Sequence, residues 1–392
     1  MTRPVLDRAT PPGRRGAPLA TAHGALPLPA FLPDATRAGV RSIDAADLRA
    51  IGVPGVVVNT FHLMRAPGTR LIKHAGGVHR FMAWDGPVLS DSGGFQVYSL
   101  IRQHPEAGVI RPNEVLFREP STGEKWRLSP EKCIQQQFQL GSDLMMCLDD
   151  CTSAEDDLDE QARAVERTVR WAQRCKAEFE KLAAARSSET PRPRLFAVVQ
   201  GGASESLRRE CAASLAEIGF DGFGFGGWPI AKDGSLLVDL LGIVADATPG
   251  DLPLHALGVG RPDHVVRAAA LGYTMFDCSL PTRDARHHRL YTFLPGMAQG
   301  PFHPGEPFYD TLYIHDQRHA ADFGPVDPSC DCPLCTRYSR AYLRHLFRVE
   351  DGTAERLATL HNLRFYVRLL HGLAQRSVVG DSSSPVGSGE RA

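Results

Sequence analysis

Short strand-like runs alternate with helix-like segments along most of this 392-residue chain, and this alternation limits the choice of fold more than any other property. Strands that alternate with helices form parallel βαβ units, and eight such strands can close into a (β/α)8 barrel. We therefore predict an α/β fold in which residues 15–284 form a TIM barrel. The eight predicted strands are Pro29–Pro33, Val56–Asn59, Pro87–Asp91, Leu144–Asp149, Leu195–Gln200, Gly222–Gly226, His255–Gly258 and Met275–Cys278.

The segments between these strands favour amphipathic helices. In Glu160–Lys181, small and apolar residues lie along one side of the predicted helix, and arginine and glutamate occupy the rest. A doubly wound open sheet is the competing fold, but no G-x-G-x-x-G motif follows the first predicted strand. The barrel is therefore preferred. The other predicted helices are Ser129–Leu140, Glu205–Ile218 and Pro262–Leu271.

The alternation stops after Cys278, which indicates a second structural unit. Residues 285–325 are rich in Pro, Gly, His and aromatic residues and predict an extended loop at the rim of the barrel, with room for a hairpin. Residues 326–375 contain a cysteine cluster followed by a largely helical segment, which predicts a zinc-binding subdomain. The polar residues 376–392 predict a disordered tail.

A cysteine cluster near the C-terminus has the spacing of a metal site. Cys330, Cys332 and Cys335 lie within six residues, and His361 follows 26 residues later on a predicted helix. A Cys3His set is a common tetrahedral zinc shell, and it leaves no ligand position open, so we predict one structural Zn²⁺ per chain. The alternative interpretation is three buried thiols beside a core histidine.

Charge and cysteine content restrict the class of protein. The net charge is −1, so any polyanion would be held by a local basic patch and not by the whole surface. Nine cysteines, an odd number, together with an N-terminus that lacks an apolar signal core, favour reduced thiols over a disulfide framework. No apolar run is long enough to span a bilayer, and we predict a cytoplasmic protein without a membrane partner.

Several predicted strands end in residues that suit chemistry. Asp91, Asp149 and Asp277 lie at or beside strand ends, and Gln200 and the pair Gly226–Gly227 end two more strands. In a TIM barrel these ends meet on one rim, where active sites lie. Carboxylates there can serve as nucleophile and as general acid or base. A single strand-end aspartate is often only a helix N-cap, but caps do not account for three together with the glycine pairs.

The motifs LSDSGGFQVYSL, LMMCLDDCT, AVVQGG, MFDCSLPTR and CDCPLC with LHNLRFY resemble those of the tRNA-guanine transglycosylase family, the queuine and archaeosine tRNA-ribosyltransferases. The resemblance extends from about Arg15 to Leu373 with the motifs in the expected order. It implies a pentosyltransferase, homodimeric in bacteria, that exchanges guanine at the wobble position of the tRNA anticodon for a 7-deazaguanine in queuosine-type modification. It also implies a (β/α)8 barrel with a zinc-binding subdomain after the last strand.

The resemblance assigns roles to individual residues. Asp277 would attack C1′ of the ribose and form a covalent intermediate, and Asp91 would act as general base on the incoming 7-deazaguanine. Phe95 would stack on the base. Arg283 and Arg286 would bind phosphates of the anticodon loop, and a second positive face is expected from Arg337, Arg340, Arg344 and Arg348. The residues implied to bind the base edges are Ser92, Asp149, Gln200, Gly226 and Gly227.

Two segments depart from the family pattern. After the glycine pair, members carry a leucine and then a glutamate that are associated with the 7-substituent, whereas this chain has Trp228, with Lys232 where the glutamate is expected and Asp233 beside it. The segment Ala285–Phe323 is longer than usual and begins with His287–His288 in place of an Asn-Gly-like pair. Two alternatives remain, a transglycosylase that inserts a 7-deazaguanine into DNA and a non-catalytic tRNA-binding partner subunit.

Overall fold

The computed structural model describes residues 15–118, 123–153, 156–187 and 190–379. Its centre is one sheet of eight strands in the order β3-β13-β12-β11-β10-β9-β5-β4. All neighbours are parallel, and the edge strands meet because the Ala35 N–H donates to the Val57 carbonyl at 2.7 Å. The predicted barrel is confirmed, and the open sheet is excluded. The strands are β3 Ala30–Pro33, β4 Val56–Val58, β5 Val88–Ser90, β9 Leu144–Met146, β10 Arg194–Val199, β11 Gly222–Phe225, β12 Leu254–Ala256 and β13 Met275–Cys278.

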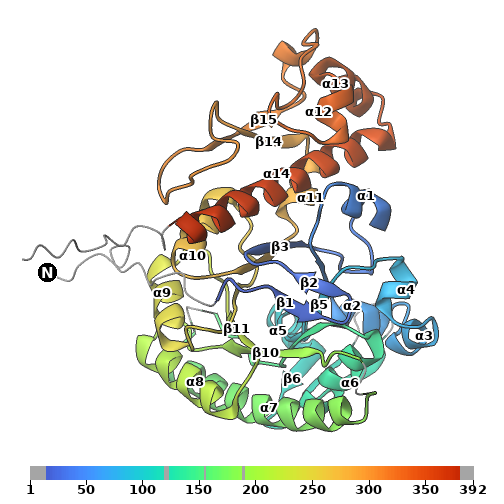
Figure 1. The fold of residues 1–392 in the computed structure, drawn as a ribbon. Helices are drawn as coiled ribbons and strands as arrows, with labels where there is room; N and C mark the ends of the chain where they lie inside the picture. Colours follow the sequence, from blue (N-terminus) through green and yellow to red (C-terminus); the bar gives the residue numbers. More distant parts are fainter. Residues whose placement is uncertain (1–14, 119–122, 154–155, 188–189, 380–392) are drawn as a thin grey trace, which may run out of the picture.

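Helices cover the outside of the barrel, and polar caps fix where several of them begin. The side chains of Ser129, Asp157 and Ser204 accept hydrogen bonds from backbone N–H groups in the first turns of α6, α7 and α8. These helices wrap the lower side in Figure 1. The barrel helices are α1 Ala45–Ala50, α2 Thr60–Arg65, α3 Thr69–His74, α4 Val78–Met82, α5 Gly94–Gln103, α6 Pro130–Leu140, α7 Leu158–Ala184, α8 Glu205–Ile218, α9 Val238–Ala247, α10 Pro262–Ala270 and α11 Leu280–Arg286.

Two small antiparallel sheets were not predicted from the sequence. The hairpin of β1 (Leu19–Thr21) and β2 (Gly24–Leu26) packs against the interior of the barrel through its leucines. The second sheet, β6 (Gly108–Ile110), β7 (Val115–Arg118) and β8 (Lys125–Leu128), is inserted between α5 and α6, preceded by the short turn η2 (Pro105–Ala107).

The hairpin is fastened to the amino-terminal end of the barrel by a buried polar group. The Asp143 carboxylate, directly before β9, lies 2.8 Å from Nδ1 of His23 and 3.0 Å from Nε2 of His79. The two imidazole rings are stacked with centroids 3.4 Å apart. Because this group precedes its strand, it lies at the end of the barrel opposite to the strand ends that carry Asp91 and Asp277.

After β13 the chain builds a second unit above the barrel in Figure 1. The segment predicted as an extended loop contains a paired hairpin, β14 (Arg289–Phe293) and β15 (Tyr309–Tyr313), and the short turn η3 (Gln317–His319). Helices α12 (Pro333–Arg337) and α13 (Arg340–Arg348) follow. Helix α14, Gly352–Val379, extends beyond residue 376, where the tail was predicted to begin, and residues 380–392 lie outside those described.

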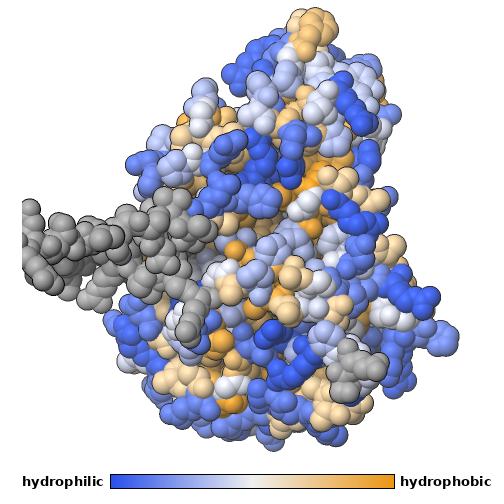
Figure 2. Space-filling view, viewed as in Figure 1, coloured by the Kyte–Doolittle hydropathy of each residue, from blue (hydrophilic) through white to orange (hydrophobic). Residues whose placement is uncertain are grey.

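Helix α14 joins the two units because it is apolar on more than one side. Its first turns pack into the core of the upper unit through Ala354, Leu357 and Ala358, and later residues such as Phe365 and Leu369 pack on the barrel. Figure 2 shows hydrophobic residues along the band between the units, while much of the surrounding surface is hydrophilic. Among the described residues, no helix is both long and apolar enough to cross a membrane.

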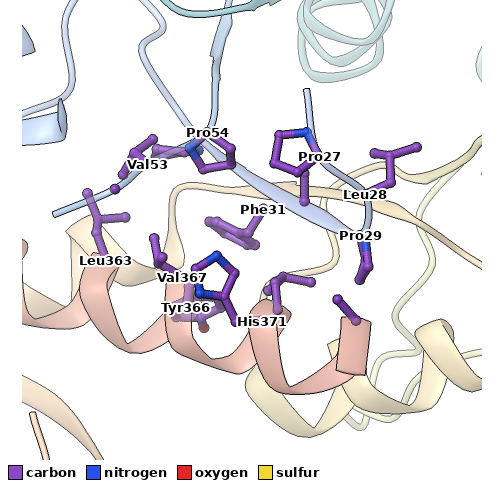
Figure 3. Close-up of a pocket in the computed structure, with 15 residues that line it drawn as sticks. Pro27, Leu28, Pro29, Phe31, Val53, Pro54, Leu363, Tyr366, Val367 and His371 are labelled. Atoms are coloured by element: carbon purple, nitrogen blue, oxygen red, sulfur yellow. The ribbon is translucent and has the colours of Figure 1, made fainter. Parts of the chain in front are cut away.

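A hollow lies along the seam between α14 and the start of β3 (Figure 3). Phe31, Pro54 and neighbouring residues face Tyr366 and Val367 across it, and its lining is almost entirely apolar. It is located where β3 begins, whereas the residues predicted to carry the chemistry follow the ends of strands. The hollow is therefore separate from the site described next.

Candidate active site

The carboxyl ends of the barrel strands bring the predicted site residues onto one rim. Asp91 and Ser92 follow β5, Asp149 follows β9, and Asp277 lies near the end of β13. In a parallel barrel these ends all point to the same face, so residues almost 190 positions apart in the chain become neighbours. The remaining members of the predicted set on this rim are Phe95, Gln200, Gly226 and Gly227.

Asp91 is held by groups at the end of the adjacent strand β4. The Asn59 amide donates to Oδ2 at 2.5 Å, and the Thr60 N–H donates to Oδ1 at 2.8 Å. Burial raises the pKa of Asp91 to about 7, the Thr60 N–H opposes this shift, and the negative charges of Asp277 and Asp34 add to it. Near neutral pH this carboxyl group can therefore both release and accept a proton.

Asp277 is oriented by a histidine that the sequence analysis did not single out. Nε2 of the fully buried His255 lies 2.8 Å from Oδ1 of Asp277, and the Gly258 N–H donates to the same oxygen at 3.2 Å. The carboxylate itself stays one-fifth exposed. An exposed, oriented carboxylate of this kind is suited to act as a nucleophile.

Asp149 and Gln200 form a polar pair beside these carboxylates. The Gln200 amide donates to Oδ2 of Asp149 at 2.6 Å. Burial raises the pKa of Asp149 to about 6, while hydrogen bonds from Gln200 and Ser92 hold it down. The Gln200 Oε1 is buried and has no partner among the described residues. A buried acceptor and a carboxylate together match a ligand edge that presents several N–H donors.

The two glycine pairs form close walls around this polar pair. A Cβ on Gly226 would lie 2.7 Å from the Gln200 side chain, and one on Gly94 would lie 3.2 Å from the Asp149 carbonyl. Gly93 and Gly227 have φ angles of 76° and 83°, which side chains other than glycine rarely adopt. Glycine at these positions therefore lets the backbone approach a flat ligand.

A buried arginine fixes the loops after β10 and β11. The Arg208 guanidinium donates to the carbonyls of Gly202 (2.7 Å), Val199 (3.1 Å) and Gly226 (3.2 Å). It also lies 4.1 Å above the ring of Phe225. Burial lowers the pKa of Arg208 to about 10, so the side chain stays charged at neutral pH. Arg208 could not be identified from the sequence, because an arginine in a helix pattern gives no sign that it is buried.

The predicted phosphate-binding arginines lie on α11, directly after Asp277. Arg283 is exposed, and Arg286 is half-buried and donates to the Thr282 carbonyl of its own helix at 2.8 Å. Burial lowers the pKa of Arg286, and the positive charge of Arg41 adds to this shift, which places Arg41 nearby. Arg41, Arg283 and Arg286 therefore lie together beside the rim, with the carboxylates of Glu355 and Asp34 also close to Arg286.

The second predicted positive face, on the helices of the upper unit, is partly committed to internal contacts. Arg340 donates to Asp322 at 2.8 Å and to the Val326 carbonyl at 3.0 Å, and Arg344 donates to Gln317 at 3.0 Å. Arg337 and Arg348 are exposed. Two of the four arginines thus support the fold of the upper unit.

The segment that departs from the family pattern forms a tight turn after β11. Asp233 accepts hydrogen bonds from the backbone N–H (2.9 Å) and hydroxyl (2.6 Å) of Ser235, so its carboxylate is used within the turn. Lys232 is exposed. Trp228 is 57% exposed, and its indole is stacked on Phe95. In the other departure, His288 contacts His315 and Phe347 through its ring.

The four predicted metal ligands come together in the upper unit. The ligand atoms of Cys330, Cys332, Cys335 and His361 all lie within 4.8 Å of one another. Nδ1 of His361 is 3.5 Å and 3.3 Å from the Cys332 and Cys335 sulfurs, and its Nε2 is 2.7 Å from the Tyr291 carbonyl. A carbonyl only accepts, so Nε2 carries the hydrogen and Nδ1 is available to a metal. The donor set fits one tetrahedral ion.

The neighbour of this histidine connects the metal site to the rim. Asn362 donates to the carbonyls of Pro281 (3.0 Å) and Arg289 (2.9 Å), and it accepts from the Tyr291 N–H at 3.2 Å. Pro281 lies in the first turn of α11, the helix that follows Asp277. The cysteines outside the cluster are also unpaired, as expected for reduced thiols.

Comparison with known proteins gives the same result along nearly the whole chain. A family model described as queuine tRNA-ribosyltransferase matches residues 11–378. The queuine tRNA-ribosyltransferase of Thermoanaerobacter pseudethanolicus is 38% identical over 359 residues, which covers 91% of this chain and 88% of the relative. The proteins of that name from Psychrobacter cryohalolentis (39% over 353 residues, 90% and 86%) and Staphylococcus aureus (40% over 357 residues, 91% and 86%) are similarly close.

Proposed function

The chain belongs to the queuine tRNA-ribosyltransferase family and is a pentosyltransferase of the tRNA-guanine transglycosylase type, and on this premise we propose that it replaces guanine at the anticodon wobble position of tRNA by a 7-deazaguanine. The observation that carries the proposal is the meeting of Asp91 and Asp277 beside the Asp149–Gln200 pair at the carboxyl ends of the barrel strands. Such a site combines a nucleophile, a proton acceptor and a base-binding edge.

The reaction proceeds by two displacements at one carbon. Asp277 attacks C1′ of the target ribose, a C1′–oxygen bond forms, and the C1′–N9 bond to guanine breaks. Asp91, whose pKa is raised to about 7, gives a proton to the departing guanine and later takes the N9 proton of the incoming base. The second attack breaks the bond to Asp277 and restores the original configuration at C1′. His255 and the Gly258 N–H hold Asp277 in place throughout.

The polar pair selects the base. The two oxygens of the Asp149 carboxylate accept from N1–H and the 2-amino group of a guanine-type base, and Gln200 and the Gly227 backbone bind the same base beside them. Ser92 supports Asp149, and Phe95 stacks on the ring. A base without these donors leaves buried acceptors unpaired, and sites of this kind reject such bases by orders of magnitude.

Cys330, Cys332, Cys335 and His361 hold one Zn²⁺ with a structural role. Three thiolates and one imidazole are the ligands that zinc prefers, and Zn²⁺ supplies folding free energy in such sites. None of the four lies on the catalytic rim.

The tRNA anticodon loop lies across the rim, with phosphates against Arg41, Arg283 and Arg286. The protein acts in the cytoplasm, where its tRNA substrate is found, and forms a homodimer, as expected for bacterial members of the family. The exposed, stacked ring pair of Tyr338 and Tyr342 on the upper unit offers a surface for such contact. Sedimentation at several protein concentrations measures the oligomeric state.

The decisive experiment is base exchange with two polynucleotides. The protein is incubated with labelled guanine and either unmodified tRNA or duplex DNA, and label retained in the polymer is counted. Labelling of tRNA alone is expected, and the Asp277→Asn variant serves as the inactive control. Labelling of DNA alone would point to a DNA transglycosylase, and labelling of neither to a non-catalytic partner subunit. Mass spectrometry of tRNA from cells with and without the gene then identifies the inserted base.

A further inference from the structure

Two exposed aromatic residues stand at matching positions on opposite walls of the candidate base site. Phe95 directly follows Gly93–Gly94, and Trp228 directly follows Gly226–Gly227. The first glycine pair lies against Asp149 and the second against Gln200. Each aromatic ring is therefore the first side chain beyond a backbone wall that contacts the polar pair.

Trp228 reaches across the rim toward the nucleophile. A Cβ added to Gly258 would lie 3.9 Å from Cζ3 of the indole, and the Gly258 N–H donates to Asp277. The loop after β11 thus extends its ring over the end of β12, on the side of the site where Asp277 lies. A planar group beside Trp228 is consequently close to the backbone that holds Asp277.

The two rings face each other with nearly the spacing that a planar ligand requires. Their planes differ by 19° and their centroids are 6.1 Å apart. A flat base between two rings needs about 7 Å, twice the usual carbon–carbon contact distance of about 3.5 Å. The rings must therefore move apart by at least about 1 Å to admit a base. Phe95 is 43% exposed and Trp228 57% exposed, and a stacked base would cover both rings.

We propose that Trp228 and Phe95 form a two-sided aromatic clamp that binds a purine-sized base between them, which makes Trp228 a specificity-determining residue of this chain. This inference rests on the proposed function for the identity of the base, but not for the existence of the clamp. The glycine pairs bring the base edges to Asp149 and Gln200, and the clamp fixes the plane of the base beside Asp277.

The indole itself reports on the clamp. Of the four tryptophans, Trp84 and Trp171 are buried and Trp126 is half-buried, so Trp228 is the most exposed. Titration of the wild-type protein with guanine is expected to quench its tryptophan fluorescence. Trp228→Phe should lose this quenching and keep guanine affinity within about threefold, because a ring remains. Trp228→Leu should weaken guanine binding, measured by calorimetry, about tenfold, the scale of one base–aromatic stack.

Phe323→Leu is the matched control, since Phe323 is 82% exposed on the upper unit and should leave guanine affinity unchanged. Melting temperature and metal content verify that each variant is folded. The clamp is overturned if Trp228→Leu binds guanine as tightly as the wild type, or if it loses affinity for tRNA alone. Failure of the wild type to exchange guanine in tRNA would instead overturn the proposed function, while the guanine titration would still decide the clamp.

Discussion

Nε2 of His255 lies 2.8 Å from Oδ1 of Asp277, and the Gly258 N–H donates to that same oxygen. Both contacts fall on one oxygen of the carboxylate, so Oδ2 is the atom that this arrangement presents to a substrate. The imidazole is fully buried, which prevents the ring from turning into solvent. Asp277 is thus held in one orientation, and for the nucleophile that we propose, pre-organisation of this kind would lower the barrier to attack.

Asp277→Asn should abolish base exchange and covalent capture of RNA while leaving the fold intact. The amide is nearly isosteric with the carboxylate but is not a competent nucleophile, so the rate should fall by several orders of magnitude. The measurement is an RNA adduct that survives denaturing electrophoresis, with Asp310→Asn on the exposed strand β15 as control. A full-strength adduct in the Asp277 variant would show that another residue attacks the ribose.

The rate of base incorporation should depend on pH through Asp91. Burial raises the pKa of this carboxyl group to about 7, and only the ionised form can take the proton of the incoming base. We expect kcat/KM for the free base to rise with pH and to level off above an apparent pKa near 7. A profile that stays flat between about pH 5.5 and 8.5, with tRNA binding constant, would contradict this role.

Asp91 should also make the protein less stable as pH rises. Its pKa is raised from 3.8 to about 7 on folding, so the folded state holds this proton more tightly than the unfolded state. The resulting stability is fully present below about pH 4 and is lost as pH rises through 7. At pH 8, Asp91→Asn should therefore melt at a higher temperature than the wild type. The corresponding gain in the free energy of unfolding is on the order of a few kcal/mol.

At pH 4 the advantage of Asp91→Asn should vanish, because the wild-type carboxyl group is then neutral as well. Melting curves at both pH values check this, with Asp310→Asn, at an exposed aspartate of β15, as the control. Equal melting temperatures for Asp91→Asn and the wild type at pH 8 would argue against a raised pKa.

Purified protein should contain about one zinc ion per chain, and Cys332→Ser or His361→Ala should lower both metal content and stability. Structural zinc supplies on the order of ten kcal/mol of folding free energy in small modules, so its loss should unfold at least the upper unit. Metal analysis and thermal denaturation measure the two effects, and Cys175→Ala, a buried thiol outside the cluster, should keep its zinc. Full metal loss with unchanged melting would refute the structural role.

The turn after β11 should favour a base with a neutral 7-substituent. Lys232 stands where a glutamate is expected, and the Asp233 carboxylate accepts two hydrogen bonds from Ser235 within the turn, so a cationic aminomethyl group would meet a like charge in place of the expected carboxylate. We expect 7-cyano-7-deazaguanine to be used more efficiently than the 7-aminomethyl base, and Lys232→Glu to reverse this preference. Competition kinetics measure the ratio of kcat/KM. A tenfold preference of the wild type for the aminomethyl base, unchanged by the substitution, would contradict it.

The strands and the strand-end residues could be predicted because both signals are local. Runs such as Met275–Cys278 are apolar, and each ends in a residue that suits a barrel rim. Asn59 ends a predicted strand too, and the rule applied to Asp91 would have identified it as a rim residue. Its pairing with Asp91 could not be predicted, because the two lie on different strands and meet only when the sheet closes.

Other contacts in the structure could not be predicted from the sequence at all. His255 opens a strand whose residues are otherwise small or apolar, and the sequence does not indicate which strand residues point toward the nucleophile. Nothing in the sequence sets Arg208 apart from the other arginines, yet it is 2% exposed because three loop carbonyls around it need a donor. The insertion 108–128 was missed since its strands pair with one another and not with the barrel.

The bridge formed by Asn362 affects how any measured turnover number should be interpreted. His361 faces the cysteines, and the next residue supports the backbone at Pro281, four positions after Asp277. If the proposed zinc ion holds His361, a preparation without that ion would lose the support that Asn362 gives to the backbone beside Asp277. Specific activity would then follow metal occupancy and not protein concentration. Two preparations of the same sequence with different metal occupancy would then give different turnover numbers.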